Sequence, residues 1–450
     1  CVRRGSRNFL PGWSSMLDVA LRVPQTAPSV HIGASFDVVS MYPQPESACL
    51  LVVDDDPLVL SSLRRILSDK GWTVIAVTDA NAALQEIEKR PIDIVLSDMH
   101  MDAMSGATLL GAVQQRHPDV VRIIMSAHTD PKLAFRVVPF AHQFLAKPVD
   151  ADVLRWTIRR ACGLRRLLTS EAIRAAVGAS NDLPAAPTTY LKLKQVLRDP
   201  GVSLSEVSAV VERDVGISAR ILQLVSSAFF GLPRRVTTVS AAVTYLGVET
   251  LRTLVLALEI VRMFRDGGSI RGFSVDALQR HSFVTAKLAR GFAEDHAADD
   301  AYVAGMLHSV GQLVLAERVP LKYAEVLERA QVEPRTLGEI ERDVLGATHA
   351  EVAGYLLGLW GLPQRIVEAV THYREPWRLD TSRLGIAGAV YVASTLAERP
   401  ETPLSASTSG PASAGKTGLS PGQLNGPYLD GAGALGSLHT WRALARRATF

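Results

Sequence analysis

The stretch Cys49-Leu-Leu-Val-Val-Asp-Asp-Asp-Pro57 places a short apolar run directly before three carboxylates and a proline. An apolar run of this length that ends at polar turn residues is typical of a buried β-strand. Similar runs occur at Thr73–Val77, Ile92–Ser97, Val121–Met125 and Gln143–Ala146, and helix-like segments such as Leu58–Lys70 and Ala80–Arg90 lie between them. Strands that alternate with helices predict a parallel sheet that is buried on both faces.

Polar or charged side chains follow four of the five predicted strands. They are Asp54, Asp55 and Asp56 after the first strand, Asp98 after the third, Ser126 after the fourth and Lys147 after the fifth. Ligands of an open parallel sheet bind beyond the carboxyl ends of its strands, which lie at one edge. Clustered carboxylates repel one another unless a cation joins them, and their oxygens select Mg²⁺. An aspartate can also attack phosphorus, while the metal and a lysine compensate the phosphoryl charge.

Four motifs follow one another in this region. They are Val53-Asp-Asp-Asp-Pro57, Leu96-Ser-Asp-Met99 with Met104-Ser-Gly106, Met125-Ser-Ala127 and Leu145-Ala-Lys-Pro148. Together they resemble the receiver domain of two-component response regulators, over about residues 48–168. The resemblance implies an α/β, doubly wound, parallel five-stranded fold for the receiver domain, whose bounds we predict as residues 48–150.

The resemblance also implies a role for each matching residue. Asp98 is the phosphoacceptor. Mg²⁺ is held by Asp54, Asp55, Asp98 and the backbone carbonyl of His100, with Asp55 favoured as the direct ligand of the acid pair. Lys147 pairs with the phosphoryl group, and its bond to Pro148 is expected to be cis. Ser126 is the switch hydroxyl and Phe144 the switch aromatic residue. Asp102 departs from the family pattern, in which proline is usual, and His100 and His128 lie at positions that tune dephosphorylation.

Residues 181–398 carry helix signals and no β-period run. Ser203-Leu-Ser-Glu206 is a capping box, Gly247 and Gly361 lie where helices should stop, and Pro320 and Pro363 suit first turns. These signals predict an all-α domain.

Four histidines lie on separate apolar helical segments of this domain, namely His281, His308, His349 and His372. The set resembles the metal cluster of HD phosphohydrolases, in which the aspartate of a His–Asp pair bridges two metals. Here the pair is His308-Ser309, and Tyr373 stands where a second histidine would follow His372. Because serine is neutral, a two-metal hydrolytic centre would lack its main anion.

Further motifs resemble the HDOD domain, a helical relative of HD hydrolases, over about residues 176–390. They are Leu183-Pro-Ala-Ala-Pro187, Arg213-Asp-Val-Gly-Ile-Ser-Ala-Arg220, Val225-Ser-Ser-Ala-Phe-Phe-Gly-Leu-Pro233, Ala242-Val-Thr-Tyr-Leu-Gly247, Ala304-Gly-Met-Leu-His308, His349-Ala-Glu-Val-Ala-Gly354 and Trp360-Gly-Leu-Pro363. HDOD domains are generally regarded as non-catalytic signalling modules. The histidines are therefore interpreted as a vestigial HD-type cluster without catalytic residues. A structural metal at the histidines and active phosphodiesterase chemistry are the alternatives.

Residues 151–180 predict a helix whose apolar stripe is flanked by arginines. The stripe is Leu154, Ile158, Ala161, Leu164 and Leu168. We favour a final receiver helix that continues into a solvated helical linker. A dimerising helix pair, which would make the protein a homodimer, comes second. Contact with nucleic acid comes last because no base-reading element accompanies the stripe.

The two ends of the chain lack sustained periodicity. Residues 1–47 are interpreted as a disordered or artefactual extension, with natural translation starting at Met41. Residues 399–450 form a low-complexity tail that is rich in Pro, Gly and Ser, and such a composition predicts disorder. A short basic helix is expected over Trp441–Phe450.

Composition narrows the class of protein. The 450 residues are 47% apolar and 21% charged, which is usual for a multidomain globular protein. Uninterrupted apolar runs of about 18 residues are missing, so no membrane span is expected. The three cysteines are too few and scattered for a disulfide framework, which favours a reducing, cytoplasmic setting.

The sequence thus predicts a cytoplasmic response regulator of a two-component phosphorelay. A cognate histidine kinase phosphorylates Asp98, and the receiver acts through a non-catalytic HDOD module that contacts downstream signalling proteins. The alternative is a receiver-controlled HD-type cyclic-dinucleotide phosphodiesterase, which Ser309 and Tyr373 disfavour. A transcription factor is a third class, but the chain lacks a recognisable reading head.

Overall fold

The computed structural model describes residues 47–68, 71–127, 140–178, 201–226, 270–379, 383–399 and 423–448, together with short pieces within 193–197, 236–247 and 404–405. Most of the predicted amino-terminal extension, the motifs at 183–187 and 227–233, and His128 lie outside these residues. Within them, no helix is both long and apolar enough to cross a membrane.

The amino-terminal part is a five-stranded parallel sheet of order β2-β1-β3-β4-β5. Its strands are β1 (Ala48–Val53), β2 (Trp72–Val77), β3 (Ile94–Asp98), β4 (Val121–Ala127) and β5 (Gln143–Lys147). Its helices are α1 (Pro57–Leu67), α2 (Ala80–Lys89), α3 (Gly106–Arg116) and α5 (Ala151–Leu164). Helix α1 contacts α5, and α2 contacts α3, so the two pairs cover opposite faces of the sheet. The predicted doubly wound fold is confirmed.

The middle of the chain is helical, as predicted. Its elements are η1 (Arg165–Leu167), α6 (Glu171–Gly178), α8 (Leu204–Val211), α9 (Val215–Ser226), α11 (Val275–Phe292), η3 (Asp295–Ala297), α12 (Ala298–Leu307), α13 (Val310–Arg318), α14 (Pro320–Val332), α15 (Leu337–Leu345), α16 (His349–Leu359), α17 (Gln364–His372), η4 (Pro376–Arg378) and α18 (Gly385–Glu398). Ser203 and Glu206 form the predicted capping box at α8, and Pro320 begins α14. Gly361 follows α16 with a φ of 82°, a conformation that glycine adopts without strain.

The carboxy-terminal segment departs from the prediction. Residues 423–448 are folded into β7 (Leu424–Asn425), α19 (Gly426–Gly431), η5 (Leu435–Ser437) and α20 (Leu438–Ala448), and β7 pairs with β6 (Leu404–Ser405). The Trp441 ring packs against Phe292 with centroids 4.8 Å apart. The prediction of a disordered tail is therefore wrong here, because average composition concealed a buried stripe of Leu438, Trp441 and Ala445. The expected basic helix is part of α20, which starts three residues earlier.

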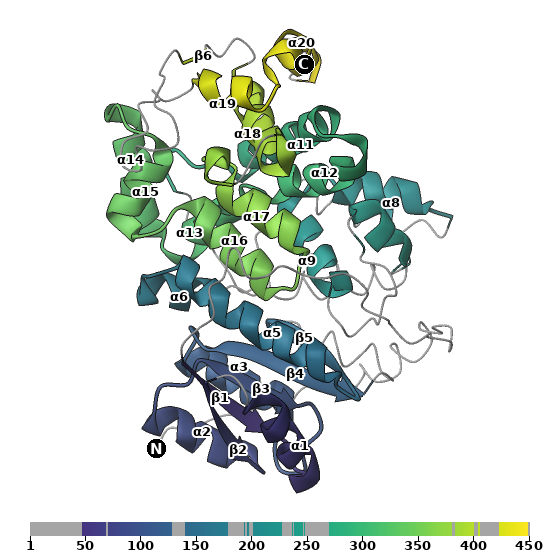
Figure 1. Cartoon of the computed structure of the whole chain (residues 1–450), viewed down its shortest axis with the longest axis vertical. Coiled ribbons are helices and arrows are strands. Elements are labelled where there is room, and N and C mark those ends of the chain that lie inside the picture. Colours follow the sequence, from purple (N-terminus) through teal and green to yellow (C-terminus); the bar gives the residue numbers. More distant parts are fainter. Residues whose placement is uncertain are drawn as a thin grey trace, which may run out of the picture.

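The arginine-flanked helix is also packed rather than solvated. Figure 1 shows α5 between the sheet and the helical part, and α5 contacts both α1 and α16. Arg160 is buried and donates a hydrogen bond to the Leu362 carbonyl. Leu164 lies so close to Gly358 that a Cβ there would be 2.4 Å from Leu164 Cδ2. The interpretation as a solvated linker is wrong, and Leu164 of the apolar stripe packs against α16 of the same chain.

Candidate functional site

The register of the parallel strands brings the predicted acid-pocket residues to one edge of the sheet. Val53 is opposite Ser97, Asp98 is opposite Met125, and Ala127 is opposite Lys147. Because the side chains at strand ends point into the same space, residues more than 90 positions apart come within hydrogen-bond distance. Asp54, Asp98 and Lys147 thus lie together at this edge, as predicted.

Lys147 joins the two buried carboxylates. Its Nζ lies 2.8 Å from Asp54 Oδ2 and 2.5 Å from Asp98 Oδ1. Asp54 and Asp98 are 1% and 6% exposed, so without this cation two buried negative charges would face each other. Burial opposes charging of Lys147, but the hydrogen bonds to Asp54 and Asp98 outweigh it and raise the pKa of the ammonium group.

Backbone groups hold the free oxygens of these carboxylates. The His100 amide donates to Asp98 Oδ2 at 2.9 Å, and the Asp56 amide donates to Asp54 Oδ1 at 3.1 Å. Asp56 also caps α1 by accepting from the Leu58 amide. Asp55 is exposed, which leaves its carboxylate facing solvent. The pocket thus has two buried carboxylates, Asp54 and Asp98, and the exposed carboxylate of Asp55 beside them, while the exposed Asp56 serves as the cap of α1.

Gly106 allows the loop after β3 to close over the pocket. A Cβ at this position would lie 2.0 Å from the Asp98 carbonyl oxygen and 2.7 Å from Ile124 Cδ1. The Ser97 hydroxyl donates to the same Asp98 carbonyl at 2.8 Å. Helix α3 therefore begins against the backbone of Asp98, and only glycine fits there.

The two predicted switch residues lie on the neighbouring strands. Ser126 on β4 is opposite Ala146 on β5, one residue before Lys147, and Phe144 lies two residues further back on β5. Both side chains are buried. The Lys147–Pro148 peptide bond is cis, as predicted.

The donor set at this edge fits Mg²⁺. The three carboxylates supply hard oxygens, and Mg²⁺ is usually held by one or two carboxylates while it keeps several waters. As the pocket stands, Lys147 fills the space between Asp54 and Asp98. Among the described residues, no three acidic, histidine or cysteine side chains are already grouped as a metal site. A bound metal would therefore use Asp55 as a ligand, and the Lys147 ammonium group would have to move aside.

The second predicted cluster lies between the helices of the carboxy-terminal part. His281 Nε2 on α11 is 3.3 Å from His308 Nε2 at the end of α12. His308 Nδ1 donates to the Gly305 carbonyl at 2.7 Å, so its Nε2 accepts from His281. Burial lowers the pKa of both imidazoles, and the charges of Arg374 and His349 lower both further; His281 also lowers the pKa of His308. These shifts favour the neutral form of both imidazoles near neutral pH.

His349 belongs to the same cluster through Tyr373. His349 Nδ1 lies 2.7 Å from the buried Glu341 carboxylate, and its Nε2 lies 2.7 Å from the Tyr373 hydroxyl. The Tyr373 ring packs edge-on against His308 with centroids 4.9 Å apart. Burial raises the pKa of Tyr373 to about 12, so its hydroxyl stays protonated.

His372 does not join the other three histidines. No hydrogen bond or ring contact between His372 and that trio is found in the described part of the chain. Successive residues of a helix differ by about 100° in direction, so Tyr373 and His372 cannot both face the cluster. Ser309 hydrogen-bonds the Ser282 hydroxyl instead of an imidazole. Sequence reasoning missed Glu341 and Ser282, because neither belongs to a local motif with a histidine.

Comparisons with known proteins agree with this division. The response regulator receiver domain model matches residues 50–159, and the HDOD domain model matches residues 183–376. An uncharacterized protein of Treponema pallidum (strain Nichols) is 27% identical over 231 residues, which is 50% of this chain and 44% of that protein. The transcriptional regulatory protein GlrR of Escherichia coli (strain K12) is 31% identical over 175 residues, or 39% of this chain and 38% of GlrR. The matches thus span less than half of each relative.

Solved structures are similar to parts of the chain. The signal receiver domain of an HD domain-containing protein from Pseudomonas fluorescens Pf-5 is 30% identical, covering 27% of this chain and 98% of that one, with a TM-score of 0.26. A fragment of the MmoQ response regulator from Methylococcus capsulatus str. Bath is 24% identical, covering 50% of this chain and 87% of that one, with a TM-score of 0.42. The family matches identify the chain as a response-regulator-type signalling protein, in which a receiver domain over residues 50–159 precedes an HDOD domain over residues 183–376.

Proposed function

We propose that the protein is a phosphorylation-dependent response regulator that accepts a phosphoryl group on Asp98 and signals through a non-catalytic HDOD domain. The observation that carries the proposal is the Lys147 ammonium group, which bonds both Asp54 and Asp98. A receiver domain implies a cognate histidine kinase as phosphoryl donor. A cytoplasmic location is part of the same proposal.

The chemistry follows from the charges of the pocket. A carboxylate oxygen of Asp98 forms the new bond to phosphorus, and the bond between phosphorus and the donor's leaving atom breaks, which leaves an acyl phosphate. The incoming group brings additional negative charge beside Asp54 and Asp55. Lys147 already contacts Asp98 Oδ1, so its ammonium group is within reach of that charge. The Ser126 hydroxyl can donate a hydrogen bond to a phosphoryl oxygen.

Mg²⁺ belongs to the proposed function. When bound, it would neutralise the phosphoryl oxygens and lower the repulsion with the acid pair. Asp54, Asp55 and Asp98 supply the side-chain ligands, and the backbone carbonyl of His100 supplies a further oxygen. Asp55 is the exposed member of the set and therefore the one free to turn toward an entering ion.

Output through binding rather than hydrolysis is supported by the histidine cluster. The position after His308 is a serine that bonds Ser282, and the neutral Tyr373 hydroxyl lies between His308 and His349. Neither group is an anion, so neither can hold two metal ions as a bridge. The buried Glu341 is engaged by the side chain and amide of His349.

The route from receiver to HDOD domain is the packed helix α5. Its Arg160 bonds the Leu362 carbonyl at the carboxyl end of the α16 segment, and Leu164 packs on Gly358. The next residue, Arg165, returns to the receiver through Asp93 at 3.2 Å. A conformational change at the strand ends of the receiver can therefore reach the HDOD domain through the existing contacts of α5 and Arg165.

The test of the receiver half is phosphorylation by acetyl phosphate. With Mg²⁺ the full chain should gain one acid-labile, hydroxylamine-sensitive phosphoryl group, which Asp98→Asn abolishes and Mg²⁺ chelation suppresses. Asp152→Asn, which alters an exposed carboxylate on α5, is the matched control and should label normally. Undiminished labelling of Asp98→Asn would refute the assignment.

The test of the HDOD half is hydrolysis of cyclic di-GMP. We expect no linear dinucleotide from the purified chain with Mn²⁺, Mg²⁺ or, under anaerobic conditions, Fe²⁺. Multiple turnovers that disappear in His308→Ala would show that the protein is a phosphodiesterase and that the non-catalytic proposal is wrong.

A further inference from the structure

A groove lies between α11 and α20, on the part of the molecule remote from the receiver sheet (Figure 1). Helix α20 starts 62 residues after the HDOD match ends at residue 376, so the groove is made partly by an element outside that match. The helix is fixed by its buried stripe and by the contact between Trp441 and Phe292. Leu444, Arg446 and Arg447 of the same helix are exposed.

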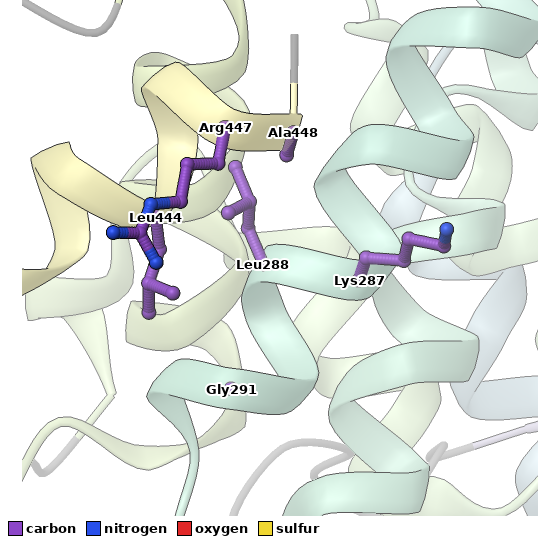
Figure 2. Close-up of a pocket in the computed structure, with 6 residues that line it drawn as sticks. All are labelled: Lys287, Leu288, Gly291, Leu444, Arg447 and Ala448. Carbon is purple, nitrogen blue, oxygen red and sulfur yellow. The ribbon is translucent and has the colours of Figure 1, made fainter. Parts of the chain in front are cut away.

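The groove has an apolar floor and a charged residue at each side. Its volume is about 290 Å³, and its lining is Lys287, Leu288, Gly291, Leu444, Arg447 and Ala448. Figure 2 shows the side chains of Lys287 and Arg447 extending in opposite directions from the central Leu288. A Cβ added at Gly291 would meet no atom within 4 Å, so the space above this glycine is open. The floor can accept an apolar side chain without rearrangement.

The charges around the groove are basic. Within the described residues, neither Lys287 nor Arg447 forms an ion pair with an acidic side chain; Lys287 Nζ lies over the Phe283 ring, 4.5 Å from its centroid. Helix α20 contains three arginines and no acidic residue. Arg290, one turn from Lys287, is already paired with Asp299 at 3.0 Å. A ligand whose charge complements Lys287 and Arg447 would therefore be acidic.

The size of the groove identifies the kind of ligand. Pockets for small molecules usually measure about 300–1,000 Å³ and enclose most of the ligand. This groove lies at the lower end of that range and is open on one side, so it suits one anchoring side chain of a larger partner, in the manner of an interface hot spot. Nucleic acid is less suited, because the floor between the two cations offers a phosphate no hydrogen-bond donor.

We propose that the groove between α11 and α20 docks an acidic peptide segment of another protein, which inserts one apolar side chain over Gly291 between carboxylates that meet Lys287 and Arg447. This surface would serve the output step of the proposed function. Its binding chemistry does not involve Asp98, so the docking proposal stands or falls separately from phosphorylation.

The experiment selects random phage-displayed peptides on the full unphosphorylated chain, with counter-selection on the double variant Lys287→Glu, Arg447→Glu. The enriched peptides should be acidic around an apolar residue. A synthetic copy of the best peptide should bind the double variant about tenfold or more weakly, and should weaken as salt rises. Arg280→Glu makes one such charge reversal on an exposed residue of α11 outside the groove, and should leave affinity within about twofold.

A second variant tests the groove without changing charge. Gly291→Met fills the open space, and since it removes a glycine from a helix it should not weaken folding. It should reduce peptide affinity about tenfold, while Asp98→Asn should leave it unchanged. Enrichment of peptides without acidic residues, or equal binding to all variants, would overturn the proposal. So would binding of a labelled DNA duplex that is lost in the double variant while no peptide is selected, which would make the surface a nucleic-acid site.

Discussion

Lys147 is the residue on which the charge balance of the acid pocket depends. Its ammonium group is the cation that both Asp54 and Asp98 bond, and both carboxylates are almost fully buried. Removing it leaves two buried anions side by side, a more severe change than the loss of an exposed ion pair. The same group must move when a phosphoryl group or a metal enters.

Replacement of Lys147 by Met should lower the free energy of unfolding by about 1–3 kcal/mol near neutral pH, because the two carboxylates lose their cation. The pKa of Lys147 is raised from 10.5 in the folded chain. Its contribution is therefore fully present below about pH 10.5 and is lost as the pH rises through the folded-state pKa. Urea unfolding of the wild-type chain and of Lys147→Met, between neutral and strongly alkaline pH, should show the difference in their free energies of unfolding. This gap should narrow only at the alkaline end. A constant gap would contradict this account.

Gly106 and Gly111 on α3 form a matched pair for testing the close approach at Asp98. Gly106→Ala places a methyl group 2.0 Å from the backbone oxygen of Asp98, which cannot move freely. We expect a loss of about 2–4 kcal/mol of stability and weaker labelling by acetyl phosphate. Gly111→Ala meets only the Phe140 ring, at 3.4 Å, and should be neutral or stabilising. Similar melting temperatures for the two variants would show that the loop adapts.

At the scale of elements, the part of the site that follows strand ends was predictable and the part between helices was not. Short apolar runs mark the strands, and parallel pairing forces Asp54, Asp98 and Lys147 to one edge. No comparable rule relates His281 on α11 to His308 on α12 or Glu341 on α15. Helical periodicity alone could not decide whether His372 or Tyr373 faces the cluster, because both lie on a helix whose neighbours were unknown.

The His281–His308 pair between α11 and α12 should make the stability of the HDOD domain depend on pH. Burial lowers the pKa of both imidazoles below 6.5, so the stability they contribute is present above pH 6.5 and lost as the pH falls through their folded-state values. The charged groups that act on the pair are Glu398, Arg374 and His349. Between about pH 7.5 and pH 5.5 the free energy of unfolding should fall by about 1–2 kcal/mol.

His281→Gln is the variant that isolates this effect. Its amide can still donate to His308 Nε2 but cannot be protonated, so the loss of stability on acidification should be smaller than in the wild-type chain. His296→Gln replaces an exposed histidine and should retain the full pH dependence. Identical pH profiles for His281→Gln and the wild-type chain would remove the imidazole pair as the cause.

At the scale of the whole molecule, the receiver and HDOD domains meet through buried arginines and backbone contacts. Arg122 at the start of β4 is fully buried and donates to the carbonyls of Phe140, Pro118, Val120 and Gly178. Gly178 is the last residue of α6, so a receiver guanidinium caps a helix that packs on α13 and α16. In the sequence, the arginines of residues 151–180 lie beside an apolar stripe, and only tertiary packing reveals that Arg160 among them is interior, as Arg122 is.

Gly178→Ala should open this joint while leaving the acid pocket intact. The added methyl group would lie 1.8 Å from the Pro118 carbonyl oxygen and 2.8 Å from its carbon, both backbone atoms, so α6 must move away. That movement breaks the 2.6 Å hydrogen bond from Arg122 to the Gly178 carbonyl, and a buried guanidinium loses one of its acceptors. Amide hydrogen exchange in α6 should accelerate about tenfold or more, since a loss of about 1.4 kcal/mol in local stability corresponds to that factor.

Phosphorylation of Gly178→Ala by acetyl phosphate should be unaffected. Asp98 and Lys147 lie at the carboxyl ends of β3 and β5, whereas Arg122 lies near the amino end of β4. Gly431→Ala is the matched control: Gly431 also ends a helix, but a Cβ there meets nothing within 4 Å. If the two variants exchange alike in α6, the contact between Gly178 and Pro118 does not hold the domains together.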